Sequence, residues 1–144
     1  TKQVTSPAIS KIRSDGFKSI IDLRPDGEAE GQPSADSMKQ LAQQENLQFS
    51  YVPVPHGEIP ESAVHALEQA LAQNPKPVLL YCRSGSRAAR TWSLVEASRP
   101  NGFGAEAILK IVKAAGLNAD DLAPQINQRV AARASSSEKG DTNK

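Results

Sequence analysis

The sequence has only one cysteine, and aromatic residues make up 4% of its 144 residues. One cysteine excludes an internal disulfide and a metal site built from cysteines alone. We expect no metal and no cofactor. A strong charge of one sign is also missing, because 17 basic and 16 acidic residues leave a formal net charge of +1. This balance argues against a nucleic acid or an anionic membrane as the main partner.

Long apolar runs are absent as well. No segment approaches the roughly 18 apolar residues of a membrane-spanning helix, and no signal peptide is visible. A lone free thiol suits a reducing compartment better than a secreted one. The sequence therefore predicts a cytoplasmic protein.

Three short apolar runs predict β-strands, at residues 18–23, 49–54 and 77–82. The last run is nearly all apolar, which is typical of a strand buried on both faces. Amphipathic spacing and stop signals predict helices between and after the strands. They cover residues 6–14, 34–45, 60–73, 86–97, 105–115 and 119–132.

Strands that alternate with helices predict an α/β fold with three layers, a central, mostly parallel sheet flanked by helices. We expect one catalytic domain over residues 1–133 and a polar tail over 134–144 that is disordered or a linker. Right-handed crossovers place the carboxyl ends of the three strands at one edge. Ligands of open α/β sheets bind at that edge, so three loops are expected to build the site.

The strongest candidate is the loop that begins at Cys82, directly after the third strand. Its backbone N–H groups can form a nest for an anion, and the following helix adds its N-terminal dipole. Glycine within the loop allows backbone conformations that other residues avoid. A thiolate at the mouth of such a nest is stabilised and acts as the nucleophile. The predicted site consists of the catalytic residues Cys82 and Arg87 and the anion-binding residues Arg83, Ser84, Gly85 and Ser86.

The loops after the other two strands offer supporting residues. Arg24 and Asp26 follow the first strand, and His56 and Glu58 follow the second. Each has a plainer interpretation: Arg24 and Asp26 can stabilise a turn, and His56 can simply be solvated. Asp22, within an apolar strand, is better explained as a buried, hydrogen-bonded structural residue than as a catalyst.

A resemblance to known cysteine-dependent proteins rests on Trp92 and on the segments GFKSIIDLRPDGE, GQPS, FSYVPV and PVLLYCRSGSR. These segments resemble the rhodanese and protein-tyrosine-phosphatase groups. The closer resemblance is to a bacterial family of phosphatase-like proteins, also called beta-lactamase-hydrolase-like, and it covers most of residues 6–125. It implies a dual-specificity-phosphatase-like α/β fold. Members often occur beside, or fused to, a persulfide dioxygenase domain, which the resemblance makes a possible partner.

The chemistry stays open between sulfur and phosphate. Tyrosine phosphatases resemble one another in having five residues between cysteine and arginine, whereas four separate Cys82 from Arg87, as in rhodaneses. Sulfur transfer also needs no strong general acid, and no acid stands in a recognisable motif. We therefore predict a sulfurtransferase that passes sulfane sulfur through a Cys82 persulfide. Its partners would be a small anionic donor, thiosulfate or a persulfide, and a small thiol acceptor.

Two alternatives remain. One is a phosphatase-like hydrolase that acts through a Cys82 phospho-enzyme, with Glu58 or Asp26 as the general acid. The other is a non-catalytic module that senses sulfur or phosphate species.

Overall fold

The computed structural model describes the backbone of residues 1–142 and the side chains of residues 1–133. The chain divides into two compact units, Thr1–Ala88 and Ala89–Lys144. The division expected from the sequence, one domain over 1–133 and a tail over 134–144, stays a prediction. The side chains of that tail lie outside the described residues.

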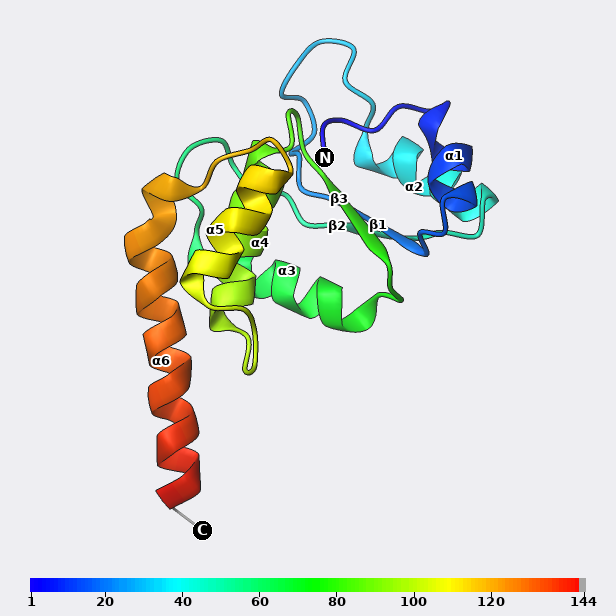
Figure 1. The fold of residues 1–144 in the computed structure, drawn as a ribbon. Coiled ribbons are helices and arrows are strands. Elements are labelled where there is room, and N and C mark those ends of the chain that lie inside the picture. Colours follow the sequence, from blue (N-terminus) through cyan, green and yellow to red (C-terminus); the bar gives the residue numbers. More distant parts are fainter. Residues whose placement is uncertain (143–144) are drawn as a thin grey trace. The chain divides into compact units, whose positions relative to one another are not determined.

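The first unit is built on a parallel sheet of three strands, in the order β2-β1-β3. Strand β1 covers Ser19–Asp22, β2 covers Gln48–Tyr51 and β3 covers Val78–Tyr81. The three strands lie side by side in Figure 1. The predicted α/β fold with a parallel sheet flanked by helices is confirmed.

The central strand is β1, not β3. All four residues of β1 are buried, whereas Val78–Leu80 of β3 are only half-buried. The expectation that the third strand is buried on both faces is therefore wrong. β3 lies at the edge of the sheet, and an apolar run does not say which strand has a neighbour on each side.

Helices cover both faces of this sheet. Helix α1 (Ala8–Ser14) and helix α2 (Ala35–Gln44) lie on one face, and α3 (Glu61–Gln73) lies on the other (Figure 1). Helix α2 begins where Ser34 caps it, since the Ser34 side chain accepts a hydrogen bond from the Ser37 N–H. This arrangement leaves the carboxyl edge of the sheet to the connecting loops.

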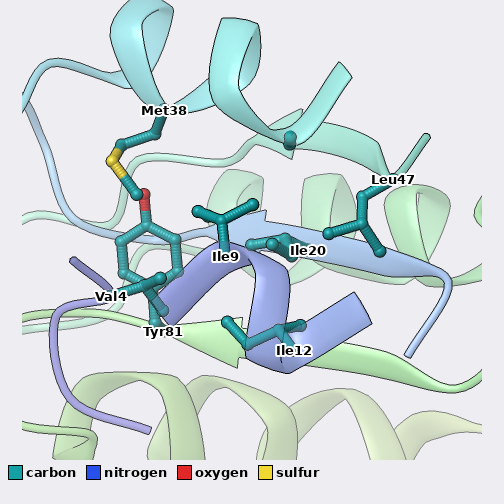
Figure 2. Packing of buried hydrophobic residues seen from close by; sticks show 8 residues of the cluster. Val4, Ile9, Ile12, Ile20, Met38, Leu47 and Tyr81 are labelled. Carbon is teal, nitrogen blue, oxygen red and sulfur yellow. The ribbon is translucent and has the colours of Figure 1, made fainter. Parts of the chain in front are cut away.

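The core between the sheet and the first two helices is mostly aliphatic, with Tyr81 buried in it. Ile20 and Tyr81 point to the same face of the sheet and pack with Ile9 of α1 and Met38 of α2 (Figure 2). Burying each side chain of this size contributes roughly 1.5–3 kcal/mol relative to leaving it exposed. The packing fixes the end of β3, from which the Cys82 loop leaves.

The second unit is helical. Helix α4 (Ser86–Ser98) begins in the first unit and continues here, followed by α5 (Ala105–Ala114), a single 3₁₀ turn (Asp120–Leu122) and α6 (Ala123–Thr142). Arg133 holds the turn after α4, because its guanidinium donates to the carbonyl oxygens of Glu96, Arg99 and Gly102. Gly102 is required there, since a Cβ would lie 2.5 Å from the Glu96 carbonyl oxygen.

One predicted helix begins in the wrong place. The sequence predicted a helix from residue 119, but α6 begins at Ala123, after the 3₁₀ turn. Proline is tolerated in the first turn of a helix but not in its interior. Starting at Ala123 places Pro124 in the first turn, and this explains the shift. Among the described residues, no helix has the length and apolarity needed to cross a bilayer.

Candidate active site

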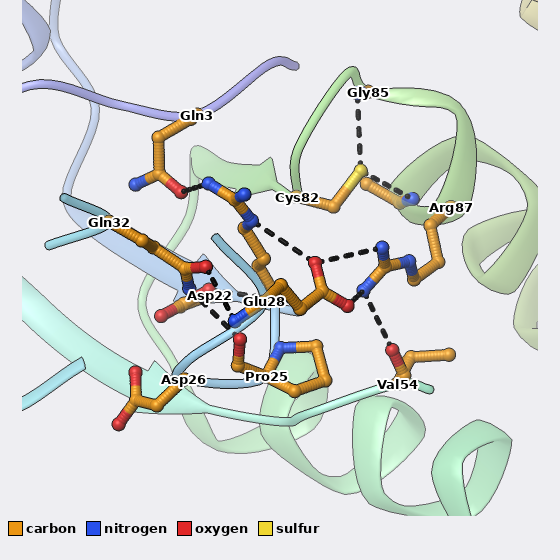
Figure 3. Close-up of polar contacts among 12 residues, drawn as sticks. Gln3, Asp22, Pro25, Asp26, Glu28, Gln32, Val54, Cys82, Gly85 and Arg87 are labelled. Atoms are coloured by element: carbon orange, nitrogen blue, oxygen red, sulfur yellow. Dashed lines mark hydrogen bonds and ion pairs between the residues drawn. The ribbon is translucent and has the colours of Figure 1, made fainter. Parts of the chain in front are cut away.

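The loop after β3 wraps around the sulfur of Cys82. The Cys82 side chain is 1% exposed. Its Sγ atom accepts hydrogen bonds from the backbone N–H groups of Gly85, at 3.1 Å, and Ala88, at 3.4 Å (Figure 3). Helix α4 begins at Ser86, so the positive end of its dipole lies at the same place. The predicted arrangement of N–H groups around a cysteine is present.

Gly85 makes this turn possible. Its φ of +100° lies in the region that other residues avoid. A Cβ there would also come within 3.2 Å of the Thr1 carbonyl carbon. Thr1 lies close because its carbonyl oxygen accepts a hydrogen bond from the Cys82 N–H, at 3.1 Å. Both the dihedral angle and the close backbone therefore call for glycine.

Arg87 is held by two other loops. Its Nη1 donates to Glu28 Oε2 at 2.9 Å and to the Val54 carbonyl oxygen at 2.9 Å, and its Nη2 donates to Glu28 Oε1 at 3.1 Å (Figure 3). The Arg87 side chain is 11% exposed. A guanidinium held by two parallel bonds to one carboxylate has a defined direction as well as a defined position.

The sequence offered Glu28 as a local carboxylate that could pair with Arg24, and it assigned no catalytic role to Glu28. Its carboxylate also accepts a hydrogen bond from Arg24 Nε, at 3.1 Å. Burial alone would raise the pKa of Glu28, but the hydrogen bonds and charges of Arg87 and Arg24 outweigh it and lower the pKa. Glu28 therefore stays ionised at neutral pH. The spacing of four between Arg24 and Glu28 at a strand end was the available signal, while the contact with Arg87 spans 59 residues.

Arg24 thus reaches Arg87 of the Cys82 loop through Glu28. Its side chain is 7% exposed, and its Nη1 donates to Gln3 Oε1 at 3.0 Å. Its backbone N–H donates to Asp22 Oδ1 at 2.8 Å. The structure joins Arg24 to Arg87 by way of one shared carboxylate.

The two predicted acids have different places. Asp26 is exposed, and its Oδ1 accepts a hydrogen bond from the Ala35 N–H at the start of α2, at 2.8 Å. Its side chain points away from Cys82 (Figure 3). Glu58 and His56 are exposed in the loop between β2 and α3. Of the two carboxylates, only Glu58 is without a structural hydrogen bond among the described residues.

The remaining loop residues differ in exposure. Arg83 and Ser84 are exposed, and Ser86, half-buried, is the first residue of α4. The backbone of Arg83 pairs with the N-terminal segment, since its carbonyl oxygen accepts from the Gln3 N–H at 3.1 Å.

Among residues 1–133, no three His, Cys, Asp or Glu side chains come together as a metal site would require.

A buried polar pair lies beneath the loop. Asp22 pairs in register with Tyr81, the residue before Cys82. Burial raises the pKa of Asp22 to about 6, and the nearby charge of Asp26 adds to the effect. The Tyr81 hydroxyl is buried beside the Asp22 carboxyl, and the interaction between these two side chains lowers the pKa of Asp22 less than burial raises it. Asp22 is a buried structural residue, as its position in the strand suggested.

The fold is similar to that of solved phosphatases. A candidate phosphatase from Neisseria meningitidis Z2491 is similar over 90% of both chains, with 31% identity and a TM-score of 0.78. Kinase associated phosphatase, solved with its catalytic-site cysteine changed to serine, is similar in fold alone. It has 13% identity and a TM-score of 0.68 over 92% of this chain and 80% of the other.

The family follows from the sequence. Residues 1–99 match the model of the phosphatase-like domain of beta-lactamase hydrolase-like proteins, and the chain belongs to this family. A beta-lactamase hydrolase-like protein from Xylella fastidiosa is 40% identical over 81 residues, and one from Agrobacterium fabrum is 37% identical over 86. These cover 56% and 60% of this chain. The chain spans about a fifth of the length of these relatives, 19% and 20%.

The predicted sulfurtransferase is wrong. The matching family is described as phosphatase-like, and the similar structures are phosphatases. The prediction relied on the four residues between Cys82 and Arg87. The structure shows why that spacing does not decide the chemistry: the short loop still directs N–H groups at the sulfur, and Glu28 and Val54 hold Arg87 from outside the loop. The predicted partners and the cytoplasmic location stay predictions.

Proposed function

We propose that this chain is a phosphatase domain that hydrolyses phosphate monoesters through a covalent intermediate on Cys82. The observation that carries the proposal is the pair of N–H groups, from Gly85 and Ala88, that point at Cys82 Sγ at the start of α4. Donors placed this way stabilise negative charge on the sulfur and on the oxygens of a bound phosphoryl group. Family membership supports the same chemistry.

The reaction has two displacements. The Cys82 thiolate attacks phosphorus, an S–P bond forms, and the bond from phosphorus to the ester oxygen breaks. The leaving oxygen takes a proton from a general acid and departs as an alcohol. Water then attacks phosphorus, the S–P bond breaks, and inorganic phosphate leaves while the water proton returns to the acid. The loop N–H groups and Arg87 stabilise the phosphoryl oxygens in both steps.

Glu58 is the preferred general acid. Asp26 caps α2 and points away from the sulfur, whereas Glu58 is exposed in the loop after β2. Val54 in that loop binds Arg87 through its carbonyl oxygen, so the loop already meets the site. Glu28 cannot serve, because its pKa is lowered by the two arginines despite its burial, and an ionised carboxylate has no proton to donate.

The deep position of Cys82 restricts the substrate. With 1% exposure, its sulfur can be reached by a small terminal group and not by a bulky one. A monoester phosphate has such a terminal group, whereas the phosphorus of a diester carries a substituent on both sides. We therefore expect monoesters to be cleaved and diesters to be left intact.

The test is hydrolysis of p-nitrophenyl phosphate and of bis(p-nitrophenyl) phosphate by the wild type and by Cys82→Ser. Removal of a nucleophile from a catalytic unit commonly costs 10³-fold or more in rate, roughly, so the variant is expected to lose monoester hydrolysis. Circular dichroism checks that it is folded. Wild-type rates in folded Cys82→Ser, or no hydrolysis of any phosphate monoester by the wild type, would overturn the proposal.

A further inference from the structure

One carboxylate connects four separate segments of the chain. Glu28 binds Arg87 from the Cys82 loop through both carboxylate oxygens and binds Arg24 from the end of β1. Gln3 holds the other side of Arg24, and the Val54 carbonyl oxygen accepts a further bond from Arg87. The Glu28 side chain is 18% exposed, and the side chains of Arg24 and Arg87 are 7% and 11% exposed. Ion pairs this shielded from solvent are weakened little by salt.

The loop that presents Glu28 does not depend on this carboxylate for its shape. The Gln32 side chain accepts from the Glu28 backbone N–H at 3.1 Å and donates to the Pro25 carbonyl oxygen at 2.9 Å. The Asp26 N–H donates to the Tyr51 hydroxyl at 2.9 Å, and the Asp26 carboxylate binds the start of α2. Replacing the Glu28 carboxylate therefore removes its contacts with the arginines and leaves the backbone anchors in place.

We propose that Glu28 is the positioning residue of Arg87, holding its guanidinium in the direction in which it meets the phosphoryl oxygens. The proposal rests on the phosphatase function proposed above. Glu28 and Val54 occupy the end of the guanidinium that carries both Nη atoms. These contacts fix the direction of the other edge of the Arg87 guanidinium, which is formed by Nε and Nη2. The N–H groups of that edge have the right spacing to donate to two oxygens of one anion.

Glu28 also sets the charge of the site. Arg24 and Arg87 together carry two positive charges, and one of these is balanced by the shared carboxylate. Loss of that negative charge makes the site more positive while the arginine loses its direction. Binding of an oxyanion and the rate of the reaction should then change in opposite directions, a result that simple damage to the fold does not produce.

The test compares Glu28→Gln with Glu30→Gln, the same substitution two residues further along at an exposed position. An amide can accept at one atom only, so it cannot hold both Nη atoms of Arg87. We expect kcat for p-nitrophenyl phosphate to fall by about 10- to 100-fold in Glu28→Gln, as misplacement of catalytic groups does. Inhibition by inorganic phosphate should be as strong as in the wild type or stronger. Glu30→Gln should match the wild type, and Glu28→Asp, which keeps the charge, should lie between.

A second readout does not depend on turnover. Selective ¹⁵N labelling of arginine, with the Arg87 signals assigned from Arg87→Lys, reports rotation about the Nε–Cζ bond. We expect separate Nη signals for Arg87 in the wild type and averaged signals in Glu28→Gln. Should Glu28→Gln not fold, Glu28→Asp is measured in the same way, and partly averaged signals are expected.

Two outcomes would overturn the inference. One is a wild-type kcat in folded Glu28→Gln, and the other is an Arg87 guanidinium that rotates no faster without the carboxylate. A wild type that hydrolyses no phosphate monoester would overturn the proposed function instead. The NMR comparison would still decide whether Glu28 holds Arg87, so the two failures are distinguishable.

Discussion

The loop after β1, residues 23–34, and the loop after β3, residues 82–87, meet at the same site but contribute in different ways. The loop after β3 turns its backbone N–H groups toward the sulfur of Cys82. The loop after β1 contributes side chains, and two of its carboxylates stand two residues apart in opposite roles. Glu28 binds Arg87, while Asp26 caps helix α2.

This difference shows that a carboxylate in a loop near Cys82 is not necessarily a proton donor. Glu28 binds Arg87 directly, yet the two arginines lower its pKa in spite of burial, so it is ionised and can only accept. Asp26 has its oxygen on a helix N-terminus. In the proposed reaction, the proton for the leaving group comes from Glu58 in the loop after β2.

The largest effect is expected from Arg87→Lys. Lysine cannot donate two parallel bonds to Glu28 and still reach the Val54 carbonyl oxygen, and it lacks the fork that binds two phosphoryl oxygens. We expect kcat/KM for p-nitrophenyl phosphate to fall by about 10²- to 10³-fold. Arg13→Lys, an exposed position of α1, is the matched control and should retain the wild-type value. Near-normal activity of folded Arg87→Lys would show that the carboxylate-held guanidinium is not part of the catalysis.

Glu58→Gln should have the next largest effect, and it should depend on the leaving group. Phenolate is a poor leaving group without a proton, so phenyl phosphate hydrolysis is expected to fall by about 100-fold. Hydrolysis of p-nitrophenyl phosphate, whose leaving group departs without a proton, should change only a few-fold. Equal losses for the two substrates would mean that Glu58 is not the acid, and His56→Gln would be measured next.

Asp22→Asn is expected to change stability and its pH dependence. The pKa of Asp22 is raised to about 6 in the folded protein from 3.8, so folding favours the protonated form. Its contribution to stability is therefore present below pH 4 and is lost as pH rises through 6. Asparagine cannot ionise, and its amide keeps a neutral polar group beside the buried Tyr81 hydroxyl.

The measurement for this prediction is urea unfolding of both proteins from pH 4 to pH 8. The difference in the free energy of unfolding, variant minus wild type, should grow by on the order of 2–3 kcal/mol across this range. A difference that is constant with pH would contradict the raised pKa of Asp22.

The smallest effect is expected from Asp26→Ala. Loss of the hydrogen bond to the Ala35 N–H should destabilise the protein by about 1 kcal/mol, a typical cost for a helix cap. The kcat should stay within about twofold of the wild type, because Asp26 points away from the sulfur. Thermal unfolding and steady-state kinetics of one preparation check both values. A large loss of kcat would make Asp26 a candidate general acid again.

The Cys82 loop could be predicted from the sequence because its parts are consecutive. Six adjacent residues contain the cysteine, the glycine and the arginine, and the strand before them and the helix after them were visible from hydrophobic patterning. Parallel strands bring their carboxyl ends to one edge, so the three contributing loops were also predictable.

The contacts between those loops could not be predicted. Arg87 meets Glu28 across 59 residues and Val54 across 33, and no local pattern encodes which carboxylate lies within reach. The prediction of sulfur transfer was wrong for the same reason. Loop length is local and was given too much weight, while the groups that complete the site come from other strands.

The most direct test of the central claim is to trap the phosphorylated enzyme. Wild-type protein is mixed with p-nitrophenyl phosphate and quenched within one turnover, and the peptide that contains Cys82 is analysed by mass spectrometry. We expect a gain of one phosphoryl group on Cys82 that is absent from Cys82→Ser. A phosphoryl group on another residue, or turnover by folded Cys82→Ser, would contradict it.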